Sequence, residues 1–507
     1  MKRGFVEFLL LVCLSYLFIV QLIAIWPFTI DDMYITLRYA KNWTSGLGLL
    51  WNVQEAPVEG YSNFSFLLLA SAALLLKTNP VVVLKAMGGI GLLLTCIFTF
   101  LISRVWLARR DSLLACIGLL LYKGQIIWAV SGLETSFFEA CICGCVYFAF
   151  RGLGYSLFPQ DRGKMYSFYF FLAGVCITLG GLTRPETPVF MVVFLVLIAW
   201  SARNLRAVMW FVLPIFCLFI PYFLWRWHYY GLLFPNPIYC KAFTNTLLFQ
   251  LDKNYIQLIW PFLAIALVGV SIDYQKPSKT MKGLFLDVRP FFLCLPSLIY
   301  VILLHDADTI VAFDNRLFLS AFALLLPLTI KGMSDSLLMI LKHRDGYYFL
   351  CLCLVFICFA KLFIPTLSLA QYRQFTINPK AGEQLRKQVL NWLKKEALDT
   401  DVVVLGDSGM IPYYSNLNYI DSYCINNKKM GQLPELVRPV FLSTQIDQKR
   451  PRFVILTSLV SKGQLIYLTN DLFLKSKFDT ENEYELTRIF TTGDRPSLYR
   501  YEIFVRK

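Results

Sequence analysis

The chain has 507 residues, of which 57% are hydrophobic and 16% charged, and its mean hydropathy is +0.57. A soluble domain cannot bury so much apolar surface, so the composition predicts a protein that crosses the membrane many times. The formal charge is +15, yet Lys and Arg occur in short clusters between apolar runs. This pattern favours topology signals and indicates that nucleic acid is not a partner.

The first apolar run follows Lys2 and Arg3 and ends at Trp26. Its length, without a small-residue cleavage site, predicts a spanning helix and not a signal peptide. Lys2 and Arg3 then keep the N-terminus in the cytoplasm, so the chain after Trp26 emerges outside. In this first outer loop (about 27–80) we expect two interfacial helices, at 34–45 and 63–77, because the second apolar run is short for a span.

The remaining apolar runs bring the prediction to about eleven spanning helices. They lie near 5–26, 81–103, 113–130, 135–151, 167–182, 187–201, 207–225, 255–272, 290–304, 316–330 and 346–365. With these spans the basic loop residues fall on the cytoplasmic side, as the positive-inside rule requires. They are Arg104, Arg109, Arg110, Arg151, Arg162, Lys164, Arg203, Arg206, Lys276, Lys279, Lys282, Arg289, Lys331, Lys342 and Arg344.

The character of the chain changes after Pro365. A membrane domain is expected over 1–365 and a soluble α/β domain over 366–507, on the external side because the number of spans is odd. Residues 381–397 have a helical apolar face, and the β-branched runs 401–407 and 452–457 are typical of buried strands. The segment GDSGMIPYY (406–414) lacks the spaced glycines of a phosphate loop and is interpreted as a strand-to-helix turn over the site.

Most of the 14 cysteines lie inside apolar runs, which predicts no disulfide framework. Cys141, Cys143 and Cys145 are two residues apart, a spacing that fits neither a helix face nor a zinc motif. We expect them to pack in the membrane core.

Ionisable and amide side chains gather at the outer ends of the predicted spans, where charges are costly unless paired, hydrated or functional. They are Asp31, Asp32, Arg38, Glu59, Glu134, Arg184, Glu186, Asn236, Lys241, Asp314 and Arg316. Each also has a purely structural interpretation, as a helix cap, an interfacial charge or a snorkelling cation.

Asp31 and Asp32 are adjacent carboxylates, which repel each other unless a cation or an arginine compensates. Such a pair suits a general base or a ligand for Mg²⁺ or Ca²⁺. The structural alternative is that the pair caps the helix that follows.

Five segments in order resemble one family. They are DDMYITLRYAKNWTSGLGLLWN (31–52), VEGYSNFSFLLLA (58–70), SGLETSFF (131–138), TRPE (183–186) and YYGLLFPN (229–236). Together they resemble bacterial integral-membrane glycosyltransferases of the GT-C superfamily, in particular the arabinofuranosyltransferase-like group. The resemblance implies transfer of a sugar from a polyprenyl-phosphate donor to an envelope glycan or lipid acceptor at the periplasmic face of the inner membrane. It also implies an essential acidic residue in the first outer loop, at Asp31 or Asp32.

The chemistry of this reaction suggests a role for each group. The acceptor hydroxyl needs a base, for which Asp31 is the first candidate, with Asp32 orienting the acceptor or holding a cation. The departing phosphate needs positive charge, which Arg184, Lys241 and Arg316 would supply. The remaining polar residues of the outer set, Arg38, Glu59, Glu134, Glu186, Asn236 and Asp314, are candidate substrate contacts. A single displacement with one base would invert the anomeric centre.

Two alternatives belong to other classes. A transporter or flippase of a lipid-linked or envelope glycan component would carry its charges deep in the spans and break its helices in matching halves. A scaffold or receptor would need no ring of acids and bases at one face.

Overall fold

The computed structural model describes residues 3–507 except 54, 156–162, 242–247, 276–287, 304–308, 342–346, 462–463, 468, 482 and 493–496. Of the basic residues used to predict the topology, Arg162, Lys276, Lys279, Lys282, Lys342 and Arg344 lie outside the described residues.

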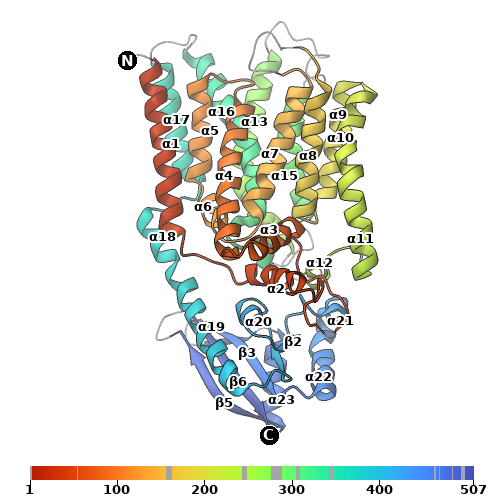
Figure 1. Ribbon diagram of the computed structural model, residues 1–507. Coiled ribbons are helices and arrows are strands. Elements are labelled where there is room, and N and C mark those ends of the chain that lie inside the picture. Colours follow the sequence, from red (N-terminus) through yellow and green to blue (C-terminus); the bar gives the residue numbers. More distant parts are fainter. Residues whose placement is uncertain are drawn as a thin grey trace.

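A helical bundle carries the N-terminus at one end and a sheet domain at the other (Figure 1). Among the described residues, each predicted span corresponds to one helix or to a bent set of helices: α1 (Arg3–Ile25), α4 (Pro80–Ser103), α5 (Arg109–Leu121) with α6 (Lys123–Ala129), α7 (Thr135–Gly152), α8 (Ser167–Thr183), α9 (Thr187–Ala202), α10 (Leu205–Pro214) with η2 (Ile215–Phe219) and α11 (Ile220–Tyr230), α13 (Leu248–Gln275), α15 (Arg289–Leu303), α16 (Leu319–Leu341) and α17 (Tyr348–Phe363). Five of the described helices are long and apolar enough to cross a membrane alone, or six if the bent α5–α6 pair is one span. The chain is a multi-span membrane protein.

The connections α4–α5 and α9–α10 lie at the same end of the bundle as the N-terminus (Figure 1). Arg109, at the start of α5, pairs with Glu7 of α1 at 3.5 Å. The basic residues of these two connections therefore share one side, which agrees with the charge pattern used for the prediction.

The opposite end of the bundle is covered by the two helices of the first outer loop, α2 (Met33–Thr44) and α3 (Phe64–Leu75). Both lie across the bundle end and not along it (Figure 1). Helix α3 contacts α4 and α8, and α2 contacts α3 and α20 (Met410–Tyr414) of the sheet domain. The two helices therefore form a layer between the bundle and the sheet domain.

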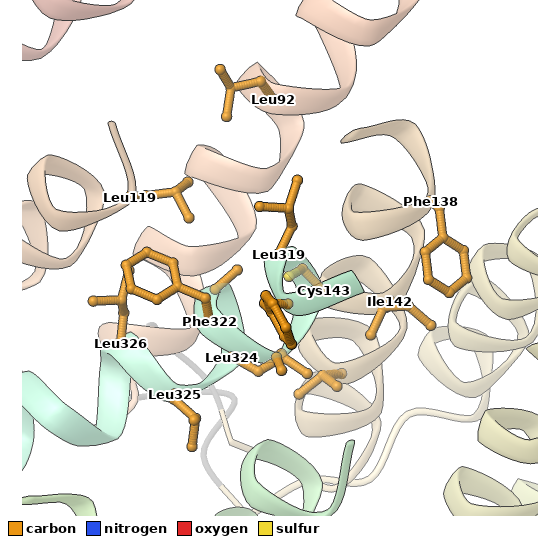
Figure 2. Close-up of a cluster of buried hydrophobic side chains, with 14 of the residues drawn as sticks. Leu92, Leu119, Phe138, Ile142, Cys143, Leu319, Phe322, Leu324, Leu325 and Leu326 are labelled. Atoms are coloured by element: carbon orange, nitrogen blue, oxygen red, sulfur yellow. The ribbon is translucent and has the colours of Figure 1, made fainter. Parts of the chain in front are cut away.

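The centre of the bundle is a continuous apolar core (Figure 2). Leu92 of α4, Leu119 of α5 and Phe138 of α7 pack around Phe322 and neighbouring leucines of α16. Cys141, Cys143 and Cys145 of α7 are buried free thiols. Their expected packing in the core is confirmed.

The sheet domain begins with α18 (Leu369–Phe375) and α19 (Ile377–Glu396). Its other elements are β1 (Val402–Leu405), α20, β2 (Asn418–Asp421), α21 (Lys428–Gly431), η4 (Glu435–Val437), α22 (Arg438–Lys449), β3 (Phe453–Ser461), β4 (Gln464–Tyr467), α23 (Thr469–Thr480), β5 (Tyr484–Thr491) and β6 (Ser497–Arg506). The strand order is β2-β1-β3-β6-β5, with β4 paired to the far half of β3. The strands β1, β2 and β3 are parallel to one another. Strand β6 runs antiparallel to β3, and β5 runs antiparallel to β6.

The two apolar runs expected to be buried strands are neighbours in this sheet, with Val403 of β1 opposite Phe453 of β3. The apolar face of α19 covers them, because its Leu385, Val389 and Leu393 are buried in the same cluster. The predicted fold class, a polytopic helical membrane protein with a C-terminal α/β domain, is confirmed.

Candidate active site

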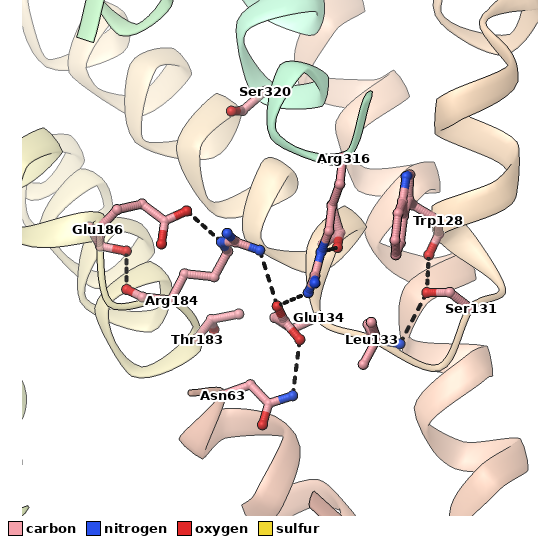
Figure 3. A network of polar contacts seen from close by, with 12 residues as sticks. Asn63, Trp128, Ser131, Leu133, Glu134, Thr183, Arg184, Glu186, Arg316 and Ser320 are labelled. Atoms are coloured by element: carbon pink, nitrogen blue, oxygen red, sulfur yellow. Dashed lines mark hydrogen bonds and ion pairs between the residues drawn. The ribbon is translucent and has the colours of Figure 1, made fainter. Parts of the chain in front are cut away.

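A buried network of charges at the sheet-domain end of the bundle is centred on Glu134 (Figure 3). Oε1 of Glu134 accepts hydrogen bonds from Arg184 Nη1 at 3.2 Å and from Arg316 Nη2. Its Oε2 accepts one from Asn63 Nδ2 at 2.9 Å. Arg184 also pairs through Nε with Glu186 at 2.5 Å. The network thus joins the first outer loop, the α6–α7 turn, the α8–α9 turn and the segment just before α16.

The two arginines are held by rings as well as by carboxylates. Arg316 lies 5.0 Å from the ring centroid of Trp128, and Arg184 lies 5.5 Å from that of Phe138. Burial alone would raise the pKa of Glu134, but the adjacent guanidiniums of Arg316 and Arg184 outweigh it, so this pKa is lowered. Glu134 is therefore ionised and fixes both cations.

Two glycines of α4 allow the turn that carries Glu134 to lie against this helix. A Cβ at Gly88 would come within 2.2 Å of the Ala129 carbonyl oxygen, and one at Gly91 within 2.6 Å of the Phe137 amide nitrogen. Any side chain at either position would push the turn outward. Both glycines thus permit close packing, which bears directly on the charge network.

Asp32 is exposed and lies within electrostatic range of Arg316 in this network. It occupies the cap position before α2, but its side chain makes no capping hydrogen bond. Its negative charge interacts electrostatically with the guanidinium of Arg316. The capping alternative is thus not what the structure has at Asp32, and its carboxylate lies within electrostatic range of Arg316.

Asp31 points instead into the sheet domain. Its Oδ1 lies 3.2 Å from Arg386 Nε and accepts a hydrogen bond from the Met410 amide at 3.0 Å. Arg386 in turn pairs with Asp407 at 2.9 Å, and Asp407 accepts a hydrogen bond from the Tyr501 hydroxyl. Burial raises the pKa of Asp31 to about 7 although the Arg386 charge opposes this shift.

The turn after β1 fits closely around Asp31. A Cβ at Gly409 would come within 2.1 Å of Asp31 Oδ2, so only glycine leaves room for the carboxylate. The segment 406–414 does form a strand-to-helix turn, as expected, and it contacts the first outer loop at Asp31.

Arg38 joins α2 to the sheet domain. Its guanidinium donates to the carbonyl oxygens of Trp51 at 2.9 Å, Pro412 at 2.5 Å and Leu417 at 2.9 Å. It also stacks over the Trp51 ring, with 4.6 Å to the centroid. The described contacts of Arg38 are made to the protein itself, so it acts as an attachment point.

Glu59 and Asn236 also make protein contacts. Glu59 forms a two-oxygen ion pair with Arg226 of α11, at 3.1 and 3.0 Å from Arg226 Nε. Asn236 begins α12 (Asn236–Lys241) and donates to the carbonyl oxygens of Cys424 and Ile425, both at 2.8 Å. Both residues therefore hold the outer loops together beside the sheet domain.

A disulfide between Cys240 of α12 and Cys424 of the sheet domain, with 5.8 Å between their Cα atoms, strengthens this attachment. The prediction of no disulfide was wrong. The apolar runs dominate the cysteine pattern, and the two cysteines that lie in outer segments are 184 residues apart in sequence.

Residues 370–504 match a family model described as "Domain of unknown function (DUF8728)". None of the curated proteins compared with the chain matches it.

Solved structures resemble nearly the whole chain. ArnT from Cupriavidus metallidurans bound to undecaprenyl phosphate has a TM-score of 0.55 at 10% identity, covering 99% of this chain and 98% of that one. The Archaeoglobus fulgidus oligosaccharyltransferase in the apo form has 0.55 at 10% identity, covering 92% and 74%. The arabinofuranosyltransferase AftD from mycobacteria has 0.52 at 11% identity, covering 97% of this chain but 40% of that one.

The chain has the GT-C fold. The resemblance noted in the sequence is confirmed at the level of fold, and the sheet domain extends the alignment with ArnT over the full chain.

Three other candidate residues lie at different positions in this GT-C fold. Glu186 belongs to the Glu134 network through Arg184. Asp314, in η3 (Thr309–Phe318), pairs with Lys123 at 3.1 Å, two residues from Arg316. Lys241 lies at the end of α12 beside the disulfide, and no described contact joins it to Arg184 or Arg316.

Sequence reasoning missed Arg386, Asp407 and Asn63. Arg386 and Asp407 lie in the sheet domain, far in sequence from Asp31. Asn63 immediately precedes the apolar helix α3. The GDSG segment was the available signal, because a glycine next to an acidic residue at a strand end indicates a close backbone approach.

The aspartate pair does not fit a divalent cation as a shared ligand set. Oδ1 of Asp31 is already engaged by the Arg386 guanidinium and the Met410 amide, and the positive charge of Arg386 beside it opposes binding of a cation. In the part of the chain that the structure describes, no three His, Cys, Asp or Glu side chains gather as metal ligands would.

Proposed function

We propose that this chain is a membrane glycosyltransferase that moves a sugar from a polyprenyl-phosphate donor to an envelope glycan or lipid acceptor. The observation that carries the proposal is an exposed carboxylate, Asp32, within electrostatic range of Arg316, whose guanidinium shares the carboxylate of Glu134 with Arg184. The GT-C fold supports it, since ArnT was solved with undecaprenyl phosphate bound.

In the proposed reaction, the acceptor hydroxyl oxygen attacks the anomeric carbon of the donor sugar. Asp32 takes the hydroxyl proton, while the bond between the anomeric carbon and the phosphate oxygen breaks. The sugar joins the acceptor with inversion, and polyprenyl phosphate leaves with the bonding electron pair. No covalent intermediate with the protein is needed.

Asp32 is proposed as the base because of its surroundings. Its carboxylate is exposed and makes no cap contact, so it can reach a substrate hydroxyl. The carboxylate of Asp31, by contrast, is engaged by Arg386 and the Met410 amide. We therefore assign Asp31 a positioning role, in which it fixes the backbone from which Asp32 projects.

Arg184 and Arg316 are proposed to receive the charge that develops on the departing phosphate. A guanidinium has five N–H donors, and the described contacts engage Nε and Nη1 of Arg184 and Nε and Nη2 of Arg316. The remaining donors can bind phosphate oxygens, and Glu134 keeps the two cations together in the absence of donor.

We assign this site to the periplasmic face of the inner membrane. The basic connections at the opposite end of the bundle support a cytoplasmic N-terminus. The Cys240–Cys424 disulfide supports an oxidising compartment for the sheet domain.

The experiment compares lipid extracts from a deletion strain complemented with the wild-type chain, with Asp32→Asn or with an empty vector. We expect a polyprenyl-phosphate-linked sugar to accumulate without the chain and to disappear with the wild type. Asp32→Asn should behave like the empty vector, with turnover reduced about 10²–10⁴-fold. Its melting temperature in detergent should stay near that of the wild type, because Asp32 is exposed.

The proposal fails if no lipid-linked sugar accumulates in the deletion strain. If the sugar accumulates but Asp32→Asn restores its consumption fully, the function stands and the base is assigned wrongly. Accumulation of a complete, unshortened lipid-linked glycan would instead favour the flippase alternative.

A further inference from the structure

A cavity of about 440 Å³ lies apart from the charge network, where the end of α1 meets α18 and α19. Val20, Ile23, Ala24 and Pro27 form its α1 side. Arg373, Thr376, Ile377 and Lys380 form the opposite side. One wall is therefore apolar, and the other carries two cations.

The cavity exists because α18 and α19 are separate helices. Phe375 of α18 packs edge-on against Phe28, with 5.3 Å between ring centroids, which holds α18 at the end of α1. The chain then bends at Thr376, whose hydroxyl donates to the Arg373 carbonyl oxygen at 2.7 Å. The bend leaves the hollow between α1 and the first turn of α19.

The side chains of Arg373 and Lys380 are exposed. Among the residues that the structure describes, neither side chain has an ion-pair or hydrogen-bond partner, although most of the cations at the active site are paired. Two cations without a counter-charge at one cavity attract an anion.

The position of the cavity along α1 indicates its surroundings. On the same helix, Tyr16, Ile19 and Ile23 are large side chains that are more than half exposed, as expected of a helix that faces lipid. Trp26, at the end of α1, is also exposed and is typical of the boundary between membrane and water. The cavity therefore opens where lipid headgroups lie.

We propose that this cavity binds the phosphate of an anionic glycerophospholipid from the leaflet on the sheet-domain side. Arg373 and Lys380 contact the headgroup phosphate, and an acyl chain lies along Val20 and Ile23 of α1. The volume is adequate for a headgroup and its glycerol, and basic pockets beside spanning helices are suited to such lipids. A bound lipid would fasten the α18–α19 bend, and with it the sheet domain, to the membrane surface.

The test uses native mass spectrometry of the purified full chain with phosphatidylglycerol or phosphatidylcholine. The wild type should retain phosphatidylglycerol preferentially. The double variant R373Q/K380Q should retain about tenfold less. The control K395Q/K429Q removes the same charge from exposed lysines of the sheet domain and should bind like the wild type.

Two further arms identify the ligand. Glycerol 3-phosphate should not displace the lipid, because it has no acyl chain to pack on α1. The charge-retaining variant R373K/K380R should restore retention, which separates loss of the cations from loss of folding.

The proposal is overturned if R373Q/K380Q retains as much phosphatidylglycerol as the wild type, or if phosphatidylcholine binds equally well. Displacement by glycerol 3-phosphate would indicate a site for soluble phosphate instead. Displacement by undecaprenyl phosphate, together with loss of sugar transfer in R373Q/K380Q, would assign the cavity to the donor.

Discussion

Asp31 and Asp32 are neighbours in sequence, yet they belong to different parts of the molecule. Asp31 is partly buried in a joint with Arg386 and Asp407 of the sheet domain. Asp32 is exposed and lies within electrostatic range of Arg316, which belongs to the network of Glu134 and Arg184 at the end of the bundle. Asp31 belongs to this joint, the contact between the first outer loop and the sheet domain. Asp32, the next residue, belongs to the proposed catalytic site.

The contrast between Asp31 and Asp32 shows that the type of a charged residue at this membrane face does not by itself indicate its role. In the joint, the opposite charges and backbone amides are fixed by packing between domains. In the network, guanidiniums are held by carboxylates beside an exposed acid. Disturbing the joint should change stability and pH dependence, whereas disturbing the network should also affect transfer.

The largest effect on stability is expected for Glu134→Gln. It leaves the buried guanidiniums of Arg184 and Arg316 without their shared carboxylate, which should destabilise the protein by about 3–5 kcal/mol and reduce transfer. Thermal unfolding in detergent and the transfer assay measure the two effects. Glu186→Gln is the control, since it removes a partner of Arg184 alone. Equal stabilities for both variants would show that Glu134 does not organise the network.

Removal of the disulfide by Cys240→Ser and Cys424→Ser should cost about 2–4 kcal/mol, chiefly by loosening the sheet domain. Reductant should lower the melting temperature of the wild type by a similar amount. The exposed free thiol Cys217 supplies the control Cys217→Ser, which should have no effect. If reductant left the melting temperature of the wild type unchanged, that result would argue against the disulfide.

The pH dependence of stability should carry the signature of Asp31. Its pKa is raised from 3.8 to about 7 by burial, so the folded protein holds a proton that the unfolded chain has released between these values. The contribution of Asp31 to stability is therefore lost as pH rises through this window. Stabilities of the wild type and Asp31→Asn, which cannot ionise, should be similar at low pH and diverge as pH rises through the window, where the wild type should lose on the order of a few kcal/mol relative to the variant. Parallel profiles would contradict this assignment.

The smallest effect is expected for Lys449→Gln, at an ion pair with Glu55 that also bridges the first outer loop and the sheet domain. Both side chains are about two-fifths exposed, at 41% and 42%. Exposed pairs contribute little, so the change should be below about 0.5 kcal/mol. A larger loss in a denaturation curve would mean that the joint extends to this surface.

The spans, the interfacial helices and the two buried strands could be predicted because each depends on local features, such as run length and periodicity. The charge network was partly predictable, since Glu134, Arg184 and Arg316 stand at the outer ends of spans. Their mutual contacts join residues up to 182 positions apart, which no local pattern encodes.

The role of Arg38 could not be predicted from the sequence. A lone arginine in an outer loop resembles a phosphate ligand, but its partners are carbonyl oxygens of Pro412 and Leu417 in a domain that follows much later. Arg386 is the converse, because it lies on the polar face of an amphipathic helix and its partner Asp31 is across the domain boundary. The partners of Arg38 and Arg386 can be identified only from the way the two domains pack together.

The closeness of Gly91 to the Phe137 backbone has a consequence for reading mutational scans. The position of Glu134 is set partly by the absence of a side chain at Gly91, inside an apolar helix. In a screen for sugar transfer, replacing Gly91 should score like replacing a reacting group, so inactive alleles within the membrane can report the geometry of the water-facing site.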